Sequence, residues 1–378
     1  MKFPWTINVL AGLCLLATTT AASAAPTSNA TDPSPVKITS LSNEEIRERL
    51  ERIDLPFKAP INKSVRDYIK QYTINGYKDS ELILGRTTMY FPIFEHYLNV
   101  YQLPKSLKYL PIVESALRAD VRSHAGAAGL WQFVPISARH FKLEVNSVVD
   151  ERLDPYRSTE AAVKMLDFLY KELGDWPLVL AAYNCGLGRV QQAIRRARCN
   201  NYWDIQQYLP QDTRRYVPAF IAAAYLGNYY QDHGLTPRYP DMDLQDTRVF
   251  RVYSNLSFYK LSKAVNLPLD ILKSLNPGFV GRYIPYNRKG HFLSVPAVYA
   301  AAVRAYLDEL QNIALDTPEG YFETFYTVTP GDRIETLASL FESNTEELLE
   351  WNGLFHQDIV ANQHLRIYLP KTNRIVRP

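Results

Sequence analysis

Apolar residues recur at three- and four-residue spacing through most of the chain from Val65 to about Gly234. This spacing places apolar side chains on one face of a helix, so it predicts amphipathic helices at nearly every step. An alternating strand pattern does not occur in this half of the sequence. We therefore predict an all-helical domain built on the segments MYFPIFEHYLNVYQL, SLKYLPIVESAL, STEAAVKMLDFLYKEL, DWPLVLAAYN and DTRRYVPAFIAAAYLGNYY.

Several helix ends can be assigned from the same pattern. The run Ser42-Asn43-Glu44-Glu45 is a capping box, and it predicts a helix through Leu50. STEAAVKMLDFLYKEL begins with a Ser or Thr cap, and Asp154, a few residues earlier, reads as a turn before that helix. DWPLVLAAYN is apolar nearly all round, so we expect this helix to be buried.

The pattern changes near Pro237. Short strand-like runs (VFRVY, FLSVP, FYTVT and LRIYLP) flank short helices from there on. The segment 261–277 recurs in similar form at 337–353, and each copy closes on a strand that ends in proline. These features predict two strand-helix-helix-strand units with a helix, Ala297 to Leu315, between them.

The N-terminus has the form of a secretory signal peptide. A basic start precedes the apolar run from Ile7 to Ala17, and Ala22-Ser23-Ala24 has the small-x-small form of a cleavage site. An N-terminal anchor helix is the alternative. A lipid anchor at Cys14 is not favoured, because Leu13 is too bulky for the position before a lipidated cysteine. We expect a protein secreted across the inner membrane into the periplasm, with cell-envelope association left open.

The predicted organisation combines these segments with a Pro-, Ser- and Thr-rich linker. It comprises a signal peptide (1–24), the linker (25–41), an N-terminal helical extension (42–97), a catalytic domain (98–236), a first small unit (248–297), a helical connector (298–320) and a second small unit (324–370).

Cysteine content and charge narrow the chemistry. After signal cleavage only Cys185 and Cys199 remain, and two readings are open: a disulfide between them, or Cys185 as a small apolar filler. The formal net charge of +3 does not suggest a nucleic-acid partner. The seven histidines are scattered, and HExxH, paired CxxC, phosphate-loop and GxSxG motifs do not occur, so no metal or cofactor is indicated.

The stretch PIVESAL places one carboxylate, Glu114, among apolar neighbours. Burial disfavours the anion and raises the pKa of a carboxyl, which produces an acid that can protonate a leaving glycosidic oxygen near neutral pH. A surface glutamate is the alternative reading. Asp120 and Asp154 are close in sequence, but neither lies in an apolar setting. One carboxylate suffices if the substrate supplies its own nucleophile.

Amide and phenol groups follow Glu114 in order along the sequence. GLWQF offers the amide of Gln132, with Gly129 for close approach, and AAYNCG places Tyr183 and Asn184 at the end of a buried helix. Tyr216 is a further phenol on a helix. Each of these alone is more often a satisfied structural group, but their joint order favours a sugar-binding site.

Together these stretches resemble the four motifs of the lytic transglycosylase (SLT) domain, over roughly residues 98–228. The resemblance implies a goose-type lysozyme-like, all-helical fold for the catalytic domain. The layout before and after it resembles the membrane-bound lytic murein transglycosylases of the D type. The matching motifs are Glu114-Ser115, GLWQF at 129–133, AYNCG ending at Gly186, and LPQDTRRYV at 209–217.

The resemblance also implies roles for the motif residues. Glu114 would act as acid and then as base, while Tyr216 would orient it. The C6 hydroxyl of N-acetylmuramic acid would attack its own anomeric carbon, so the β-1,4 bond to N-acetylglucosamine would break without water. Residues implied to line the site are Ser115, Gln132, Tyr183, Asn184 and Tyr216. The amides of Gln132 and Asn184 would hold N-acetyl groups. The sequence departs from the family pattern at Cys185, where alanine or proline is usual.

The second small unit resembles a LysM module, a strand-helix-helix-strand fold that binds glycans containing N-acetylglucosamine. Gly331, Asp332 and Asn352 keep the LysM pattern and are the glycan-binding residues that the resemblance implies. The earlier copy has Asn255-Leu256 in place of Gly-Asp, so we interpret it as a degenerate unit that only packs.

We therefore expect a multidomain, cofactor-free enzyme, with an all-α lysozyme-like domain followed by small α/β modules, acting on peptidoglycan strands. One alternative is a goose-lysozyme-type muramidase that uses water. The other is an inactive murein-binding scaffold.

Overall fold

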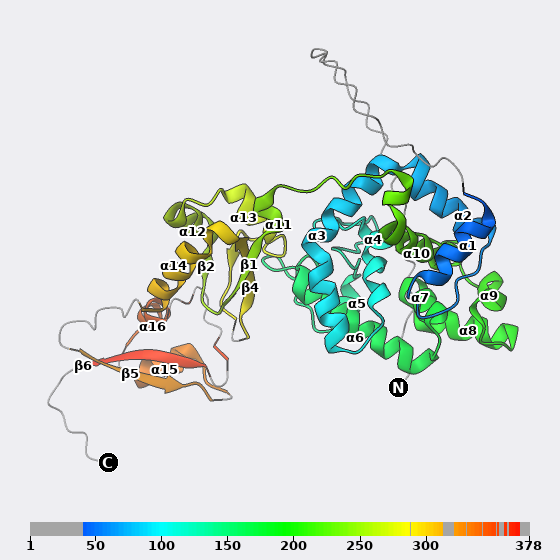
Figure 1. Cartoon of the computed structure of the whole chain (residues 1–378). Coiled ribbons are helices and arrows are strands. Elements are labelled where there is room, and N and C mark those ends of the chain that lie inside the picture. The colour runs from blue at the N-terminus through cyan, green and yellow to red at the C-terminus, as the bar shows by residue number, and fades with distance from the viewer. Residues whose placement is uncertain are drawn as a thin grey trace, which may run out of the picture. The chain divides into compact units, whose positions relative to one another are not determined.

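The computed structural model describes residues 41–287, 289–312, 321–329, 331–341, 343–352, 354, 359–360 and 363–370. They form two compact units (Figure 1). The first comprises the described residues up to 146 together with 150–241, and the second comprises 147–149 together with the described residues from 242 onward. The predicted signal peptide and most of the predicted linker lie outside the described residues.

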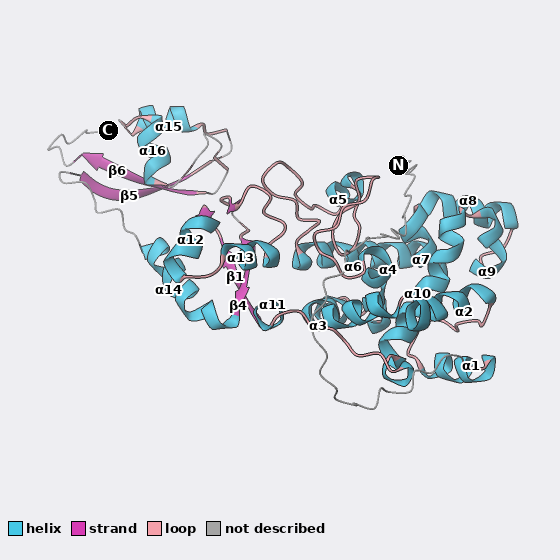
Figure 2. Cartoon of the chain, turned by 90° about the horizontal axis from the view of Figure 1, so that it is seen from above, coloured by secondary structure: helices cyan, strands magenta, loops and turns pink. Residues whose placement is uncertain are grey.

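The first unit is helical, as predicted (Figure 2). Its elements are α1 (Asn43–Arg52), α2 (Lys63–Lys70), the π-helix η1 (Gln71–Asn75), α3 (Tyr77–Val100), η2 (Lys105–Tyr109), α4 (Leu110–Ser115), α5 (Pro135–His140), α6 (Pro155–Leu173), α7 (Trp176–Cys185), α8 (Leu187–Ala197), α9 (Tyr202–Ile205), η3 (Gln206–Tyr208), α10 (Gln211–Tyr229) and η4 (Gln231–His233).

The helices are less continuous than their spacing predicts. Residues 116–134 and 141–154 form loops that carry isolated β-bridges, such as Ala128 with Phe133. Ala116 and Leu117 have positive φ, and so do Gly126 and Gly129. Successive residues cannot continue a right-handed helix through such backbone angles, so the chain leaves helical geometry here.

The capping box on Ser42 is present, but the predicted start of α6 is wrong. Asp154 caps this helix, because its carboxylate accepts from the backbone N–H groups of Tyr156 (2.8 Å) and Arg157 (2.9 Å). The hydroxyl of Ser158 instead donates to the carbonyl of Asp154 at 2.6 Å. A serine inside the first turn can bond backwards in this way, so its sequence position imitates a cap.

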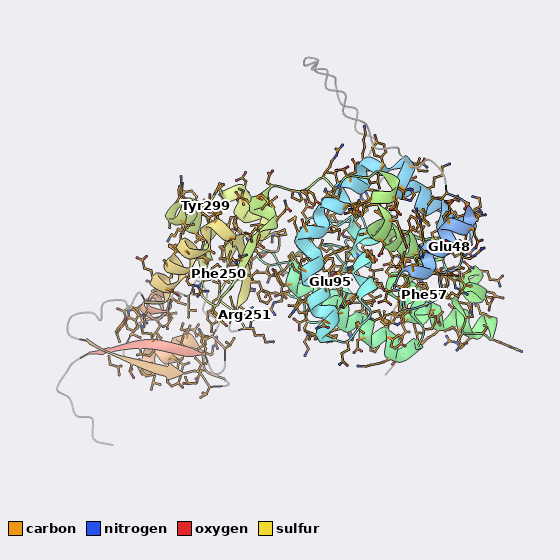
Figure 3. All side chains as sticks on the ribbon, viewed as in Figure 1. Glu48, Phe57, Glu95, Phe250, Arg251 and Tyr299 are labelled. Carbon is orange, nitrogen blue, oxygen red and sulfur yellow. The ribbon has the colours of Figure 1, made fainter. Side chains whose placement is uncertain are left out.

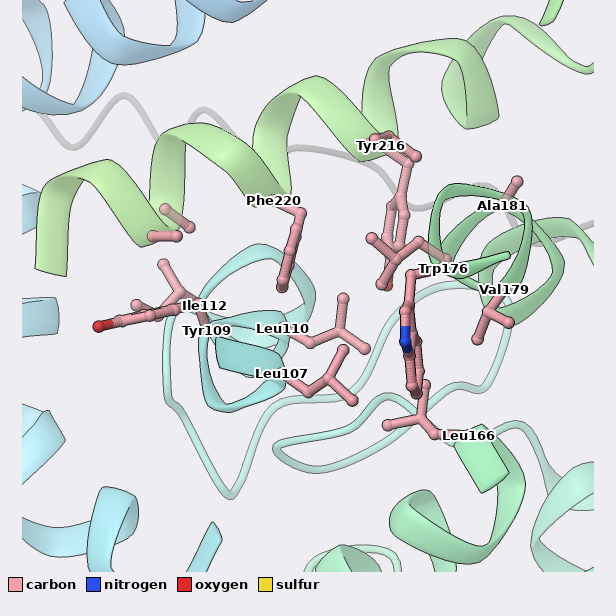
Figure 4. Close-up of a cluster of buried hydrophobic side chains, with 14 of the residues drawn as sticks. Leu107, Tyr109, Leu110, Ile112, Leu166, Trp176, Val179, Ala181, Tyr216 and Phe220 are labelled. Carbon is pink, nitrogen blue, oxygen red and sulfur yellow. The ribbon is translucent and has the colours of Figure 1, made fainter. Parts of the chain in front are cut away.

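The core of the first unit lies around α7 and α10. Helix α10 packs against α2, α4 and α7. Tyr216 and Phe220 of α10 reach toward Leu110 of α4, with Trp176 of α7 close by (Figure 4). Every residue of α7 except Tyr183 is buried, which confirms the burial expected from its apolar composition.

The predicted N-terminal extension shares this core. Ile46, Val65 and Phe94 belong to the same buried cluster as the residues of α7 and α10. Phe57 follows α1, and its ring lies 6.3 Å from that of Phe220, between ring centres (Figure 3). The guanidinium of Arg49 donates to the hydroxyl of Tyr225 at 3.0 Å. Residues 42–97 are therefore part of the first compact unit.

The second unit contains two antiparallel strand pairs, each enclosing two helices. Strand β1 pairs with β4 so that Thr247 faces Pro296, and β5 pairs with β6 so that Tyr321 faces Pro370. Both predicted strand-helix-helix-strand units are present, and the first contains a further short pair, β2 with β3. The elements are α11 (Met242–Gln245), β1 (Thr247–Val252), β2 (Leu256–Ser257), α12 (Phe258–Val265), α13 (Leu269–Leu275), β3 (Tyr283–Ile284), β4 (His291–Pro296), η5 (Ala297–Tyr299), α14 (Ala300–Asn312), β5 (Tyr321–Thr327), α15 (Ile334–Leu340), α16 (Thr345–Trp351) and β6 (His364–Pro370).

Each of the two small folds has its own buried cluster. On the first, the guanidinium of Arg304 lies over the ring of Phe250, and that of Arg251 lies over the ring of Phe292, at 5.1 Å and 4.9 Å from the ring centres (Figure 3). The predicted connector helix is η5 with α14, and residues 313–320 lie outside the described residues. None of the described helices combines the length and apolar character needed to cross a bilayer.

Candidate active site

Glu114 lies near the end of α4, a helix of only six residues. Ala116 and Leu117 follow with φ of 52° and 58°, and Leu117 is fully buried. A left-handed conformation is unfavourable for a bulky residue, so packing must hold it in place. The guanidinium of Arg86 on α3 also donates to the carbonyl of Ala116 at 3.1 Å. The packing of Leu117 and the hydrogen bond from Arg86 therefore fix the backbone that carries Glu114.

The side chain of Glu114 is half-buried in the pocket wall. Burial raises its pKa to about 7, and the hydrogen bond that it accepts from the hydroxyl of Tyr216 acts in the opposite direction. Burial also holds the pKa of Tyr216 and of Tyr183 well above the usual value, so both phenols remain donors. Near neutral pH, Glu114 can thus hold a proton or release it.

The GLWQF segment is a tight loop. Gly129 has φ of +81°, and a Cβ added there would meet the carbonyl oxygen of Arg152 at 1.8 Å, so only glycine fits. Trp131 is fully buried, and its indole N–H donates to the hydroxyl of Thr159 at 2.9 Å. Gln132 has φ of 49°, and its amide donates to the carbonyl of Gly129 at 2.8 Å. Its Oε1 has no partner among the described residues.

A buried ion pair between Arg152 and Asp150 supports this loop. The guanidinium of Arg152 donates to the carbonyls of Gly126 (2.7 Å) and Phe133 (3.3 Å) and makes two 2.8 Å bonds to Asp150. Burial alone would raise the pKa of Asp150, but its bonds to Arg152 and Arg122 hold it below the usual value. Sequence reasoning missed this pair, since a charged run between helices normally indicates a solvated turn.

The AYNCG segment faces the loop from the end of α7. The hydroxyl of Tyr183 donates to the carbonyl of Trp131 at 2.8 Å. The Oδ1 atom of Asn184 accepts from the hydroxyl of Thr213 on α10 at 2.8 Å. This bond occupies the oxygen of the amide and fixes its orientation. The NH₂ group of Asn184 has no hydrogen-bond partner among the described residues.

Ser115 does not have the expected place in the site. Its buried hydroxyl lies 3.0 Å from the carbonyl of Pro111 and 2.9 Å from that of Leu130, so it ties α4 to the GLWQF loop. It is absent from the pocket wall described below. These bonds fix the end of α4, which carries Glu114, relative to the loop that carries Gln132.

A solvent-open pocket with an empty volume of about 580 Å³ lies over these groups. Sequence reasoning placed Glu114, Gln132, Tyr183 and Asn184 here, and the structure brings all of them together. It missed Ser137 on α5 and Met165 on α6, because a single serine and a single methionine on amphipathic helices carry no motif. The pocket is lined by Glu114, Trp131, Gln132, Phe133, Val134, Ser137, Met165, Ala182, Tyr183, Asn184, Cys185 and Gly186.

Other carboxyls near the site have structural roles. Burial raises the pKa of Glu151 to about 7, and partial burial raises that of Asp154 to about 6. Asp154 caps α6, while Glu151 accepts from the backbone N–H of Glu144 at 2.8 Å. Asp120 is exposed. Among the described residues, Glu114 is the only carboxyl in the pocket wall.

Both cysteines are free thiols, so the disulfide reading does not hold in this structure. Cys185 is buried beside the pocket, where burial raises the pKa of its thiol, and it fills space as the second reading expects. Cys199 lies past the end of α8, half-buried. Within the described part of the chain, no group of three or more His, Cys, Asp or Glu residues is placed to hold a metal ion.

The implied glycan-binding residues of the last module are engaged within the module itself. Gly331 turns the chain with φ of +98°, and the carboxylate of Asp332 accepts from Thr329 N–H at 2.6 Å and from Tyr326 O–H at 3.0 Å. Asn352 bonds to Arg366 through both ends of its amide (2.9 Å and 2.6 Å). These contacts support the fold of the module, and the glycan contacts implied by the resemblance stay a prediction.

Three family models match the chain. The Transglycosylase SLT domain matches residues 92–206, a LysM-like domain of lytic transglycosylase MltD matches residues 246–312, and the LysM domain matches residues 326–367. The first covers every pocket residue described above, and the second covers the copy that the sequence suggested was degenerate.

Curated relatives agree with these matches. Membrane-bound lytic murein transglycosylase D of Escherichia coli (strain K12) is 30% identical over 327 residues, which cover 83% of this chain and 71% of that protein. Soluble lytic murein transglycosylase of the same strain is 32% identical over 177 residues, covering 45% of this chain and 25% of that protein. The solved structure of the 70-kDa soluble lytic transglycosylase from Escherichia coli matches with 22% identity and a TM-score of 0.33, over 46% of this chain and 31% of that one.

Proposed function

Because the chain belongs to the membrane-bound lytic murein transglycosylase D family, we propose that it cleaves peptidoglycan glycan strands, with Glu114 as its single acid and base. The bond cleaved is the β-1,4 bond between N-acetylmuramic acid and N-acetylglucosamine. The new end is a 1,6-anhydromuramic acid.

The first step needs a proton on Glu114. As the bond from C1 to the leaving oxygen lengthens, Glu114 gives its proton to that oxygen and the sugar develops oxocarbenium character. The pKa of about 7 leaves a large fraction of Glu114 protonated at neutral pH. The hydroxyl of Tyr216 holds the carboxyl in one orientation and stabilises the carboxylate that remains.

The second step uses the same carboxylate as a base. It removes the proton from the C6 hydroxyl of the muramic acid ring, whose oxygen then bonds to C1 and closes the anhydro ring. Glu114 ends the cycle protonated, and water is not consumed. The Oε1 atom of Gln132 and the NH₂ group of Asn184 have no hydrogen-bond partner among the described residues. These two groups would bind the acetamido groups of the flanking sugars.

The observation that carries this proposal is one half-buried carboxyl of raised pKa, bonded to a phenol, inside a pocket with two amides. Glu114→Gln should lower turnover of isolated sacculi by about a hundredfold or more while leaving glycan binding nearly intact. Glu151→Gln is the matched control, since Glu151 has a similarly raised pKa but lies outside the pocket wall. Turnover retained in Glu114→Gln would reject the assignment.

The rival muramidase differs in its product. Mass spectrometry of digested sacculi should find anhydro ends, because no second carboxyl lies in the described pocket wall to activate a water. Reducing ends would identify a hydrolase, and no release of fragments at all would identify an inert scaffold.

Export and wall binding complete the proposal. The signal-like N-terminus would direct the chain to the periplasm, where the substrate lies. The LysM module would hold the enzyme on glycan strands and raise the local substrate concentration at the catalytic unit.

A further inference from the structure

Ser137 is a buried residue in the wall of the pocket. It lies in the first turn of α5, and only 6% of its surface is exposed, yet it lines the pocket. Its hydroxyl has no hydrogen-bond partner among the described residues. The hydroxyl is therefore free to bond to a group that binds in the pocket.

The lack of a partner has a cause in the fold. A helical serine usually donates to the carbonyl four residues earlier, as Ser158 does to Asp154. For Ser137 that acceptor is the carbonyl of Phe133, which already accepts from Ala128 N–H at 3.1 Å and from Arg152 at 3.3 Å. The ion pair that holds the GLWQF loop thus occupies the acceptor on which Ser137 would otherwise close.

The wall that contains Ser137 also contains apolar residues. Val134, Met165 and Ala182 also line this pocket, and Met165 is itself 8% exposed. A methionine side chain is flexible and polarizable, so it adapts to a small apolar group. One hydroxyl donor and apolar side chains in the same pocket suit a ligand that joins a carbonyl oxygen to a methyl group.

From these observations we infer that Ser137 and Met165 form a recognition site for an acetamido group of the substrate. The hydroxyl of Ser137 donates to the acetamido carbonyl, and Met165 contacts its methyl. This inference rests on the proposed function, since it takes a glycan strand to be the substrate. It assigns specificity for N-acetylated sugars to α5 and α6, outside the motifs that mark the family.

The test compares Ser137→Ala on two substrates: fully N-acetylated glycan strands and the same strands after chemical de-N-acetylation. The variant should lose about threefold to tenfold in kcat/KM on acetylated strands, mainly through KM, because one neutral hydrogen bond is lost. On de-N-acetylated strands, its kcat/KM should equal that of the natural enzyme. Ser137→Cys keeps nearly the same side-chain volume with a weaker hydrogen-bond donor. Its kcat/KM on acetylated strands should lie between that of the natural enzyme and that of Ser137→Ala.

Ser158→Ala is the matched control, because Ser158 is a buried serine in the first turn of α6 whose hydroxyl bonds within the helix. It should not change discrimination between the two substrates. Equal losses for Ser137→Ala on both substrates, or no loss on acetylated strands, would overturn the inference. Anhydro product from the natural enzyme is read separately, so failure here is distinguishable from failure of the proposed function.

Discussion

At the scale of single residues, the proposed chemistry depends on the environment of one carboxyl, that of Glu114. Burial favours the protonated form of Glu114, while Tyr216 favours the ionised form through its hydrogen bond. The two effects together leave a pKa of about 7, close to the pH at which the proposed mechanism needs the group both to give and to take a proton. A carboxyl at its ordinary pKa would hold too little proton to act as an acid there.

Tyr216→Phe removes the effect that lowers the pKa of Glu114. The alkaline limb of the pH–rate profile reports loss of the proton from Glu114, so it should move to higher pH. Loss of a hydrogen bond to a charged group should also lower kcat by about tenfold or more. Tyr202→Phe is the control, since this buried phenol donates to the carbonyl of Thr213 away from the pocket. A limb that stays in place in Tyr216→Phe would contradict the assignment.

The same pKa makes a prediction for stability. Below pH 4.5 Glu114 is protonated in both the folded and the unfolded chain. Between pH 4.5 and about 7 the unfolded chain ionises while the folded chain keeps its proton, so the natural protein loses stability as pH rises. Glu114→Gln avoids this loss. The free energy of unfolding of the variant minus that of the natural protein should therefore be about 3 kcal/mol larger at pH 8 than at pH 4. Denaturant unfolding at both pH values measures it, and a pH-independent difference would speak against burial of the charge.

Sequence identified those residues whose chemistry is unusual for their setting. Glu114 among apolar neighbours, and Tyr183 with Asn184 on a buried helix, are such cases. Ser137 and Met165 could not be found, because their contribution arises from neighbours on other helices. Ser115 was misplaced for a similar reason: its hydroxyl is taken up by the carbonyl of Leu130, which only the fold brings near.

At the scale of elements, the GLWQF loop decides the shape of the site. Its backbone supplies the acceptors for Ser115 and Tyr183, and its own position depends on the close approach of Gly129 to Arg152. Small displacements of this loop would therefore move Gln132 and the acceptor of Tyr183 together.

Gly129→Ala should disrupt the loop, because the new Cβ would overlap the carbonyl of Arg152. We expect a loss of several kcal/mol in the free energy of unfolding, about 3 kcal/mol or more, with loss of activity. Gly126→Ala is a control in the same loop: φ is +79°, but nothing lies within 4 Å of the added atom. It should cost about 1 kcal/mol. Equal effects, measured by thermal and denaturant unfolding, would show that the close approach is unimportant.

Elements set by local periodicity were predictable, and those set by long-range contacts were not. The apolar run of α7 and the repeat of the small units carried enough local signal. In the repeat, Asn276 bonds to Ser294 just as Asn352 bonds to Arg366, which explains why both copies keep this asparagine. The loops at 116–134 depend on Arg152 and on positive φ at Ala116 and Leu117, which no spacing reveals.

At the scale of the whole molecule, the proposed catalysis and the proposed wall binding belong to separate parts. The pocket is built from the first unit, whereas the last module has a buried cluster of its own. Removing residues 313–378 should therefore leave turnover of soluble glycan oligomers unchanged. Binding to whole sacculi should weaken by about tenfold or more, because the tether to the substrate is lost. Co-sedimentation with sacculi measures this, and a matching fall in oligomer turnover would show that the module supports catalysis.

The central claim is that the Glu114 carboxyl holds its proton near neutral pH. Its titration can be followed by carbon NMR with labelled glutamate, and the resonance is assigned by its absence in Glu114→Gln. We predict a midpoint near pH 7. A midpoint near 4.5, the ordinary value for a glutamate, would contradict the claim.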